Sequence, residues 1–275
     1  MASLDPHNDG LEFPNGFSGE DPIEVAMARN YFLIPAYNEA ENLGYLLPNI
    51  RRYMEAFHYP YEIVVVDDGS SDGTAAVVDA HREVHGIPAE VIVHATNKGP
   101  GGAFETGFRA ILERAEADDR IVTIEADNTS DLCVLNRMLM RSDRGFDLVL
   151  ASVYGGGRII GAPRSRLLLS SVANSMMKVA FNMPQINTFS SFFRVHRAGM
   201  IQAAFDLHGD DFISEPGFVC AVEMLIKLHR MGATIAEVPM LLDSNIRIGD
   251  SKMKIARTVR AYLRVIARHG VQGGL

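Results

Sequence analysis

Two carboxylates, Glu125 and Asp127, stand two residues apart just after a short apolar run at 121–124 that favours a strand. If the strand continued, both side chains would lie on one face. Close carboxylates repel each other unless a proton or a cation lies between them. Oxygen ligands favour Mg²⁺ or Mn²⁺, and Mg²⁺ usually takes one or two carboxylates together with substrate phosphates. The pair therefore predicts a divalent-cation site; the alternative is a solvated turn with Asp131 as a helix cap.

Strands and helices alternate along the chain, which predicts an α/β fold with a mostly parallel sheet and helices on both faces. Apolar, β-branched runs predict strands at 31–34, 62–66, 91–94, 121–124 and 147–151. Asn38 and Glu41 have the spacing of a capping box for the first helix. Such sheets bind ligands outside the carboxyl ends of their strands. By that rule one edge gathers Tyr37, Asp67, Asp68, Lys98, Glu125 and Asp127.

Composition narrows the class of protein. The 275 residues are 47% hydrophobic and 22% charged, as in ordinary globular proteins, and the net charge of −8 argues against a nucleic-acid binder. Two distant cysteines form neither a disulfide framework nor a zinc motif, so we expect a reducing, cytoplasmic compartment. Residues 1–28 lack signal-peptide order and predict a mobile arm, followed by one domain over 29–250. Polar residues interrupt the apolar region 167–183, which predicts an amphipathic helix rather than a membrane span.

Four motifs in order resemble a family 2 glycosyltransferase of the GT-A fold. They are PAYNE at 35–39, VVVDDGSSDGT at 64–74, NKGPGGAFETGF at 97–108 and EAD at 125–127. The later segments RLLLSSVAN at 166–174, 217–239 with Glu223, and GDSKM at 249–253 are similar to the polyprenyl-phosphate (dolichol-phosphate) mannosyl- and glucosyltransferase branch. The resemblance spans 31–268 and implies inverting, metal-dependent transfer of a sugar from a GDP- or UDP-sugar to a polyprenyl phosphate.

The resemblance also implies roles for residues. The nucleoside would contact Pro35, Tyr37, Glu39 and one of Asp67 or Asp68. The sugar and phosphates would lie near Lys98 and the backbone of Gly101 and Gly102. The diphosphate or an acceptor phosphate would be bound by Arg166, Ser170, Arg247 and Lys252, although a solvated surface charge is an equal reading of Arg166. Mg²⁺ or Mn²⁺ would be held by Glu125 and Asp127; Asp127 is the firmer ligand, because glutamate lengthens the other arm by one methylene.

The chain departs from the branch at three positions. These departures leave open which donor and acceptor it uses and whether it is catalytic. Glu125 replaces an aspartate, Val153 replaces an arginine and Asn187 replaces an aspartate. A soluble sugar or small-molecule hydroxyl is an alternative acceptor, and it would need a general base. The loop with Asp210, Asp211 and Glu215 could supply one, although we favour reading these residues as loop and helix N-terminal charges. The chain could also be a non-catalytic nucleotide-sugar-binding partner subunit, and the oligomeric state stays open.

The C-terminal residues 251–275 predict a basic amphipathic helix and tail. Its apolar stripe contains Ala256, Val259, Leu263 and Ile266. A second stripe contains Lys254, Arg257, Arg264 and Arg268, with no acidic residue after 251. This pattern indicates contact with an anionic membrane surface, so the protein could be peripheral at the cytoplasmic face. In the alternative, which we favour slightly, the apolar stripe packs on the domain and the charges are solvated.

Overall fold

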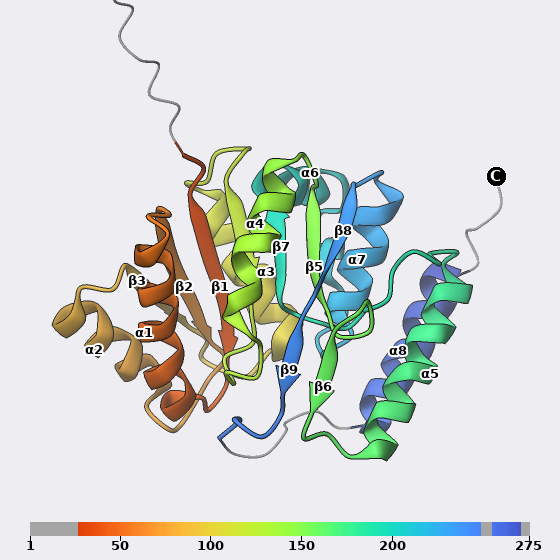
Figure 1. Ribbon diagram of the computed structural model, residues 1–275, viewed down its shortest axis with the longest axis horizontal. Coiled ribbons are helices and arrows are strands. Elements are labelled where there is room, and N and C mark those ends of the chain that lie inside the picture. Colours follow the sequence, from red (N-terminus) through yellow and green to blue (C-terminus); the bar gives the residue numbers. More distant parts are fainter. Residues whose placement is uncertain (1–26, 249–254, 271–275) are drawn as a thin grey trace, which may run out of the picture.

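The computed structural model describes residues 27–248 and 255–270 and is built around a seven-stranded sheet (Figure 1). The strand order is β3-β2-β1-β4-β7-β5-β8. β7 pairs antiparallel with β4 and β5, whereas the other pairings within this sheet are parallel. The predicted α/β fold with a mostly parallel sheet is therefore confirmed. The strands are β1 (Asn30–Ala36), β2 (Tyr61–Asp67), β3 (Ala89–Val93), β4 (Arg120–Thr123), β5 (Leu148–Ser152), β7 (Arg194–Arg197) and β8 (Ile235–Pro239).

Helices cover both faces of the sheet, and each face has its own core. One core packs α1 (Ala40–Ala56), α2 (Thr74–His85) and α4 (Leu135–Asp143) on side chains such as Phe32 and Val65. The other packs α3 (Gly99–Leu112), α6 (Ala198–His208) and α7 (Cys220–Arg230) on side chains such as Leu33 and Val64. Because neighbouring strand residues point to opposite faces, a strand covered on both sides is mostly apolar; β7 departs from this, with Arg194 and His196 buried. Two 3₁₀ turns, η1 (Leu132–Val134) and η2 (Gly209–Ile213), complete these layers.

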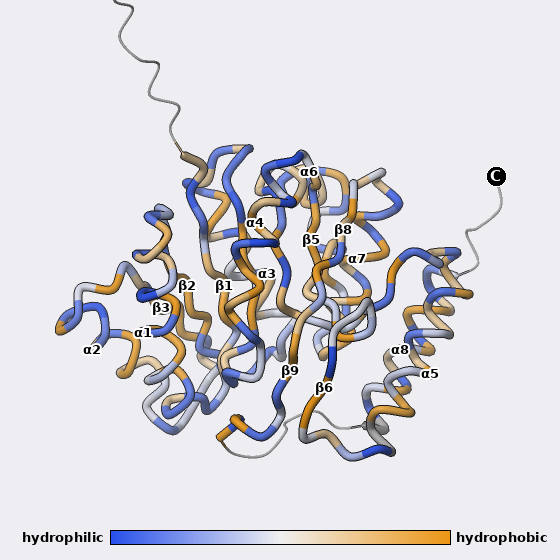
Figure 2. The backbone as a smooth tube through the Cα atoms, viewed as in Figure 1, coloured by the Kyte–Doolittle hydropathy of each residue, from blue (hydrophilic) through white to orange (hydrophobic). Residues whose placement is uncertain are grey.

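Two long helices, α5 (Arg164–Ala180) and α8 (Ile255–His269), lie side by side at one edge of the molecule (Figure 1). In the chain, β6 (Arg158–Ile160) comes before α5 and β9 (Leu241–Asp243) comes before α8. These two strands pair as a small parallel sheet. Apolar and polar positions alternate along both helices (Figure 2). The inward face of α8 matches our expectation only in part: Ile266 of the predicted packing stripe packs against the core beside the buried Ala261 and Val265, whereas Val259 and Leu263 of that stripe are about half exposed.

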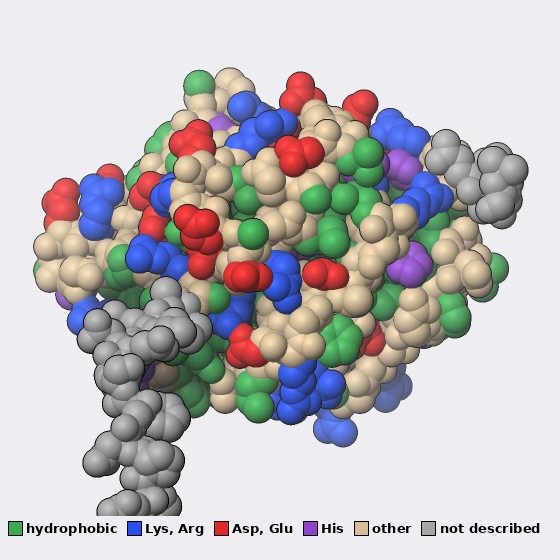
Figure 3. All heavy atoms as spheres, turned by 90° about the horizontal axis from the view of Figure 1, so that it is seen from above, with side chains coloured by type: hydrophobic (Ala, Val, Ile, Leu, Met, Phe, Trp, Pro, Cys, Tyr) green, Lys and Arg blue, Asp and Glu red, His purple; other side chains and the backbone are tan. Residues whose placement is uncertain are grey.

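The face seen from above in Figure 3 lies at the amino ends of the parallel strands, opposite the edge where we expect the ligand. Acidic and basic side chains are interspersed across this face. A continuous basic field, which nucleic-acid binding requires, is not visible there. None of the described helices combines the length and apolar composition needed to cross a bilayer.

The packing of α3 on β1 gives a test of this core. A Cβ atom at Gly107 would lie 2.0 Å from Cδ1 of the fully buried Leu33. We expect Gly107→Ala to lower the free energy of unfolding by about 1–3 kcal/mol in urea denaturation, because the close-packed core cannot give way. Gly44→Ala is the matched control, since its Cβ would meet nothing within 4 Å, and it should be neutral or stabilising. Equal losses in both variants would contradict this account.

Candidate active site

The turns after β1 and β2 are bound to each other at the carboxyl edge of the sheet. Ala36 pairs with Asp67 in register, so both strands end together. Asn38, at a φ of 52°, accepts a hydrogen bond at Oδ1 from the Ser71 backbone N–H (2.8 Å), and its own N–H donates to Ser70 Oγ (2.8 Å). The predicted capping box is wrong: α1 begins at Ala40 without a side-chain cap. Asn38 fixes the neighbouring turn instead.

Asp67 and Asp68 have different partners. Asp68 is buried, and Oδ1 accepts hydrogen bonds from His94 Nδ1 (2.7 Å) and the Lys98 N–H (2.8 Å). Oδ2 of Asp68 accepts from the Gly99 N–H (2.7 Å). Asp67 is equally buried, and its Oδ1 accepts from the N–H of Ser70 in its own turn (2.9 Å). Asp68 therefore serves to hold the loop that enters α3.

Glycines in the first turn of α3, which continues directly from that loop, are needed for close packing. A Cβ at Gly101 would lie 2.1 Å from the Glu215 carbonyl oxygen, and the Gly101 N–H donates to the Pro216 carbonyl (2.9 Å). At Gly99, with a φ of +81°, a Cβ would lie 2.3 Å from the same Pro216 oxygen. A Cβ at Gly102 would lie 2.6 Å from Cβ of Lys98. The loop is thus pressed against the segment that precedes α7.

The acidic pair follows the end of β4 rather than continuing the strand, which ends at Thr123. We had expected both carboxylates to lie on one face of a continuing strand. Because β4 ends before them, they do not share a strand face. Glu125 accepts hydrogen bonds from the Phe192 N–H (3.1 Å) and Ser130 Oγ (3.0 Å). Burial, and then the charge of Asp127, raise the pKa of Glu125 above its usual value. A cation between the pair would relieve this repulsion.

Asp127 is the carboxylate of the site that pairs with a cationic side chain, that of Arg247. Its Oδ2 forms an ion pair with Nη2 of Arg247, and its Oδ1 accepts from Thr129 Oγ1 (2.7 Å) and the Thr129 N–H (3.1 Å). Nε of Arg247 is buried and has no hydrogen-bond partner among the described residues. An unpaired buried donor on a guanidinium is costly, and an anionic oxygen would satisfy it.

The side chains at this edge suit a hard divalent cation that also binds substrate oxygens. Within residues 27–248 and 255–270, no three His, Cys, Asp or Glu side chains gather into a metal site. The candidate ligands at this edge are the two carboxylates of Asp127 and Glu125. Mg²⁺ takes one or two carboxylates when phosphates complete its coordination shell. Both oxygens of Glu125 accept hydrogen bonds from the protein, and both oxygens of Asp127 are engaged by Thr129 and Arg247, so the hydrogen bonds do not rank the two; Asp127 as the firmer ligand stays a prediction.

Some of the other expected site residues lie around the edge of the sheet, and others lie outside the residues that the structure describes. Tyr37 and Lys98 are exposed, and Pro35 and Glu39 are half-buried. Ser170 is partly buried on the first two turns of α5, which starts on the side of the molecule where β1 ends (Figure 1). The side chain of Arg166, on the same turns, and all of Lys252 lie outside the described residues, as do the arm at 1–26 and GDSKM at 249–253.

No local sequence pattern identifies the residues that bind the positions where the chain departs from the family pattern. Glu237 of β8 accepts hydrogen bonds from the Asn187 N–H (2.8 Å), Asn187 Nδ2 (2.6 Å) and the Thr188 N–H (2.8 Å). Lys178 of α5 donates to Asn187 Oδ1 (2.8 Å). An aspartate at 187 would face Glu237 with like charge, so asparagine suits this neighbour. Val153 is buried in the core beneath the same loop.

The chain is similar to known glycosyltransferases in sequence. The model for glycosyl transferase family 2 matches residues 31–206. Polyprenol monophosphomannose synthase of Mycolicibacterium smegmatis is 29% identical over 260 residues, which cover 94% of this chain and 93% of that protein. Undecaprenyl-phosphate mannosyltransferase of Micrococcus luteus is 32% identical over 223 residues, covering 80% and 86%.

Among solved structures, the chain resembles glucosyl-3-phosphoglycerate synthase from Mycobacterium tuberculosis in complex with Mn²⁺ and UDP-glucose. The TM-score is 0.58 at 18% identity, over 90% of this chain and 81% of that one. At this identity the likeness concerns the fold, which is GT-A-like, as expected. The family match covers most of the sheet and every turn of the carboxyl edge described above. The chain therefore belongs to glycosyl transferase family 2 and is a glycosyltransferase.

Proposed function

We propose that the protein transfers a sugar from a GDP- or UDP-sugar to a polyprenyl phosphate, with Mg²⁺ or Mn²⁺ held at Asp127. The observation that carries this proposal is the Asp127–Arg247 ion pair at the edge where the turns after β1, β2 and β4 meet. The names of the two relatives, a polyprenol monophosphomannose synthase and an undecaprenyl-phosphate mannosyltransferase, support the acceptor class.

The nucleoside would bind over the joined turns after β1 and β2. Tyr37 is exposed there, and Pro35 and Glu39 flank it. Of the two aspartates we assign Asp67 to the nucleoside, because three hydrogen bonds engage both oxygens of Asp68. A carboxylate accepts from base N–H groups and ribose hydroxyls. The loop with Lys98, Gly101 and Gly102 would then receive the sugar and phosphates.

Arg247 would act on the leaving diphosphate. A bound divalent ion would neutralise negative charge on the departing group. Asp127 would then no longer need its guanidinium partner, and Arg247 could turn its Nη2 and its unpaired Nε toward phosphate oxygens. Glu125 would keep its hydrogen bonds to Phe192 and Ser130 and act as the outer acidic group. Arg166, Ser170 and Lys252 are proposed donors to the same phosphates or to the acceptor.

A phosphate acceptor fits the state of the nearby carboxylates. A phosphate is ionised near neutral pH and needs no general base, whereas a hydroxyl acceptor does. Of the carboxylates considered for that task, Glu215 is buried and paired with Arg264 (2.8 Å), whereas the side chain of Asp210 pairs with Arg109 (2.7 Å) but is 96% exposed. The engagement of Glu215 favours the lipid phosphate over a soluble sugar.

The acceptor would reach the site through a membrane-facing surface on α5 and α8. We call it the α5–α8 apolar surface; it consists of Leu168, Leu169, Val172, Met176, Val179, Val259 and Leu263, all at least 44% exposed. Inserting one such leucine into lipid contributes about 1.5–3 kcal/mol. The exposed arginines 257, 264 and 268 of the basic stripe on α8 add attraction to anionic headgroups. We propose peripheral binding to an anionic bilayer, which uses the side of α8 that we had expected to pack inward.

The metal and donor proposal is tested by Asp127→Asn. We expect the thermal stabilisation by GDP or UDP with Mn²⁺ to disappear and sugar transfer to polyprenyl phosphate to fall at least about 100-fold, since charge compensation of the leaving group is lost. Asp131→Asn is the control, because Asp131 only caps η1 (2.9 Å to the Cys133 N–H). Retention of the Mn²⁺-dependent shift in Asp127→Asn would overturn the proposal. Nucleotide binding without transfer by the native chain would favour the non-catalytic partner subunit.

The membrane proposal is tested by flotation with vesicles of phosphatidylglycerol and phosphatidylcholine. We expect the double variant Leu168→Glu/Leu263→Glu to bind at least about tenfold more weakly, because two carboxylates replace inserted leucines. Val84→Glu/Leu207→Glu is matched to it, since both residues are highly exposed on helices outside this surface. Equal loss in the two double variants, or no loss in the first, contradicts a role for the α5–α8 apolar surface.

A further inference from the structure

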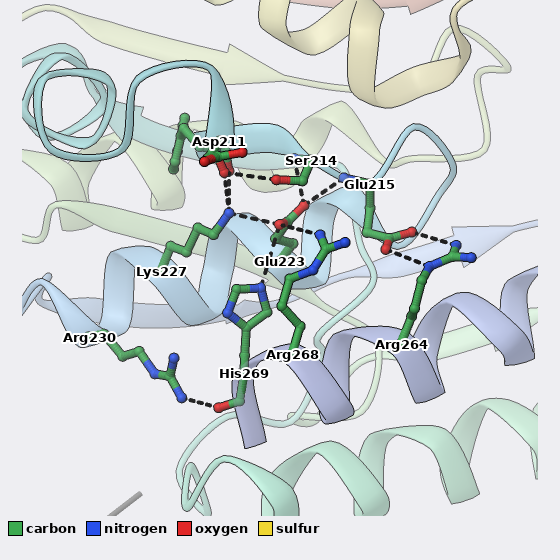
Figure 4. A network of polar contacts seen from close by, with 10 residues as sticks. Asp211, Ser214, Glu215, Glu223, Lys227, Arg230, Arg264, Arg268 and His269 are labelled. Carbon is green, nitrogen blue, oxygen red and sulfur yellow. Dashed lines mark hydrogen bonds and ion pairs between the residues drawn. The ribbon is translucent and has the colours of Figure 1, made fainter. Parts of the chain in front are cut away.

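A fully buried carboxylate, Glu223 of α7, organises the turn that follows η2 (Figure 4). Its Oε2 accepts hydrogen bonds from the Ser214 N–H (2.9 Å) and the Glu215 N–H (2.8 Å). Its Oε1 accepts from Lys227 Nζ (2.7 Å), which also donates to the carbonyls of Asp211 and Phe212. The turn is therefore fixed to α7 by charge-assisted hydrogen bonds, which are stronger than neutral ones.

Helix α8 attaches to the same turn from the other side. Arg264 donates to both oxygens of Glu215, from Nε at 2.9 Å and from Nη2 at 2.8 Å. The Glu215 side chain is only 3% exposed, so Arg264 is the cation that balances a buried charge. Arg268 and His269 approach Glu223 at 3.8 and 3.5 Å (Figure 4). The helix with the membrane-facing residues is thus attached to the domain through acidic residues of α7 and of the turn before it.

The backbone of this turn presses on the loop that enters α3. Gly101 donates its N–H to the Pro216 carbonyl, and a Cβ at Gly99 or Gly101 would overlap the carbonyl oxygen of Pro216 or Glu215. On its far side the loop is held by Asp68. With no free space between them, a shift of Glu215 must shift the loop.

We infer that the Arg264–Glu215 pair couples the seating of α8 to the geometry of the 97–102 loop, and so to donor binding. The inference rests on the proposed function, which gives this loop the sugar and phosphates of the donor. Arg264 and Glu215 are positioning residues: they act through the backbone of Glu215 and Pro216 on Gly99 and Gly101. Energetic coupling is reciprocal, so donor binding must also stabilise the docking of α8. A membrane that holds α8 would in turn favour the donor-binding loop.

The test uses the full chain and Arg264→Gln, with Arg260→Gln as the matched exposed arginine of the same helix. We expect calorimetry to show GDP or UDP with Mn²⁺ binding about fivefold more weakly to Arg264→Gln and unchanged to Arg260→Gln. Arg264→Lys should recover part of the affinity, because it keeps the charge but not the two-pronged geometry. Amides of 97–104 should exchange hydrogen faster in Arg264→Gln even without nucleotide. Nucleotide should slow exchange across 257–269 in the native chain, but not in that variant.

Leu139→Ala separates coupling from lost stability, because Leu139 is buried on α4 in the opposite core. If it weakens nucleotide binding as much as Arg264→Gln does, or if Arg264→Gln binds like the native chain, the inference is overturned. Failure of the proposed function looks different: no variant, nor the native chain, would bind either nucleotide. Exchange of 97–104 would still decide the coupling in that case, since unchanged exchange in Arg264→Gln overturns it.

Discussion

Buried and half-buried carboxylates that accept backbone N–H groups are the interaction on which the functional edge depends. A carboxylate without partners in the interior is very unfavourable, so each one fixes whatever donors surround it. Asp68 holds the loop before α3, Glu223 the turn before α7, and Glu237 the segment before β7. Glu125 does the same for Phe192. Loops that differ widely in sequence position thereby acquire defined positions relative to the sheet.

This use of acidic residues also sets the charge that a ligand would meet. A nucleoside diphosphate would be repelled by an edge rich in unpaired carboxylates. Asp68, Glu125 and Glu223 accept hydrogen bonds from donors inside the protein, and two further carboxylates carry arginines: Asp127 has Arg247 and Glu215 has Arg264. These two ion pairs differ in how readily a ligand could replace one of the partners. Among the described residues Nε of Arg247 has no hydrogen-bond partner, whereas Arg264 uses both arms of its fork on Glu215. In the proposed function a ligand would rearrange the first pair and leave the second in place.

The sequence predicted five of the seven strands of the main sheet, β1 to β5, and the edge where they end, because apolar runs and polar strand ends have a direct physical signature; it did not predict β7, which reads RVHR, or β8. It could not assign partners. Asp67 and Asp68 are adjacent and identical, and only the approach of His94 and the Lys98–Gly99 backbone from the next strand separates their roles. Glu237 and Asn187 are fifty residues apart, so no local pattern relates them. The capping box at Asn38 failed for a similar reason: a neighbouring turn competed for the same side-chain oxygen.

The orientation of α8 shows how tertiary ion pairs override an amphipathic pattern. Hydrophobicity alone would turn Val259 and Leu263 inward. Arg264 and Arg268, four residues apart and so on one face, must instead reach Glu215 and Glu223, and this requirement fixes the rotation of the helix. Ala261 and Val265 then face the domain, and Val259 and Leu263 remain outside. One rotation thus creates both the outward apolar stripe and the attachment to the turn beside the donor loop, so in the proposed enzyme lipid contact and donor binding would share a single helix.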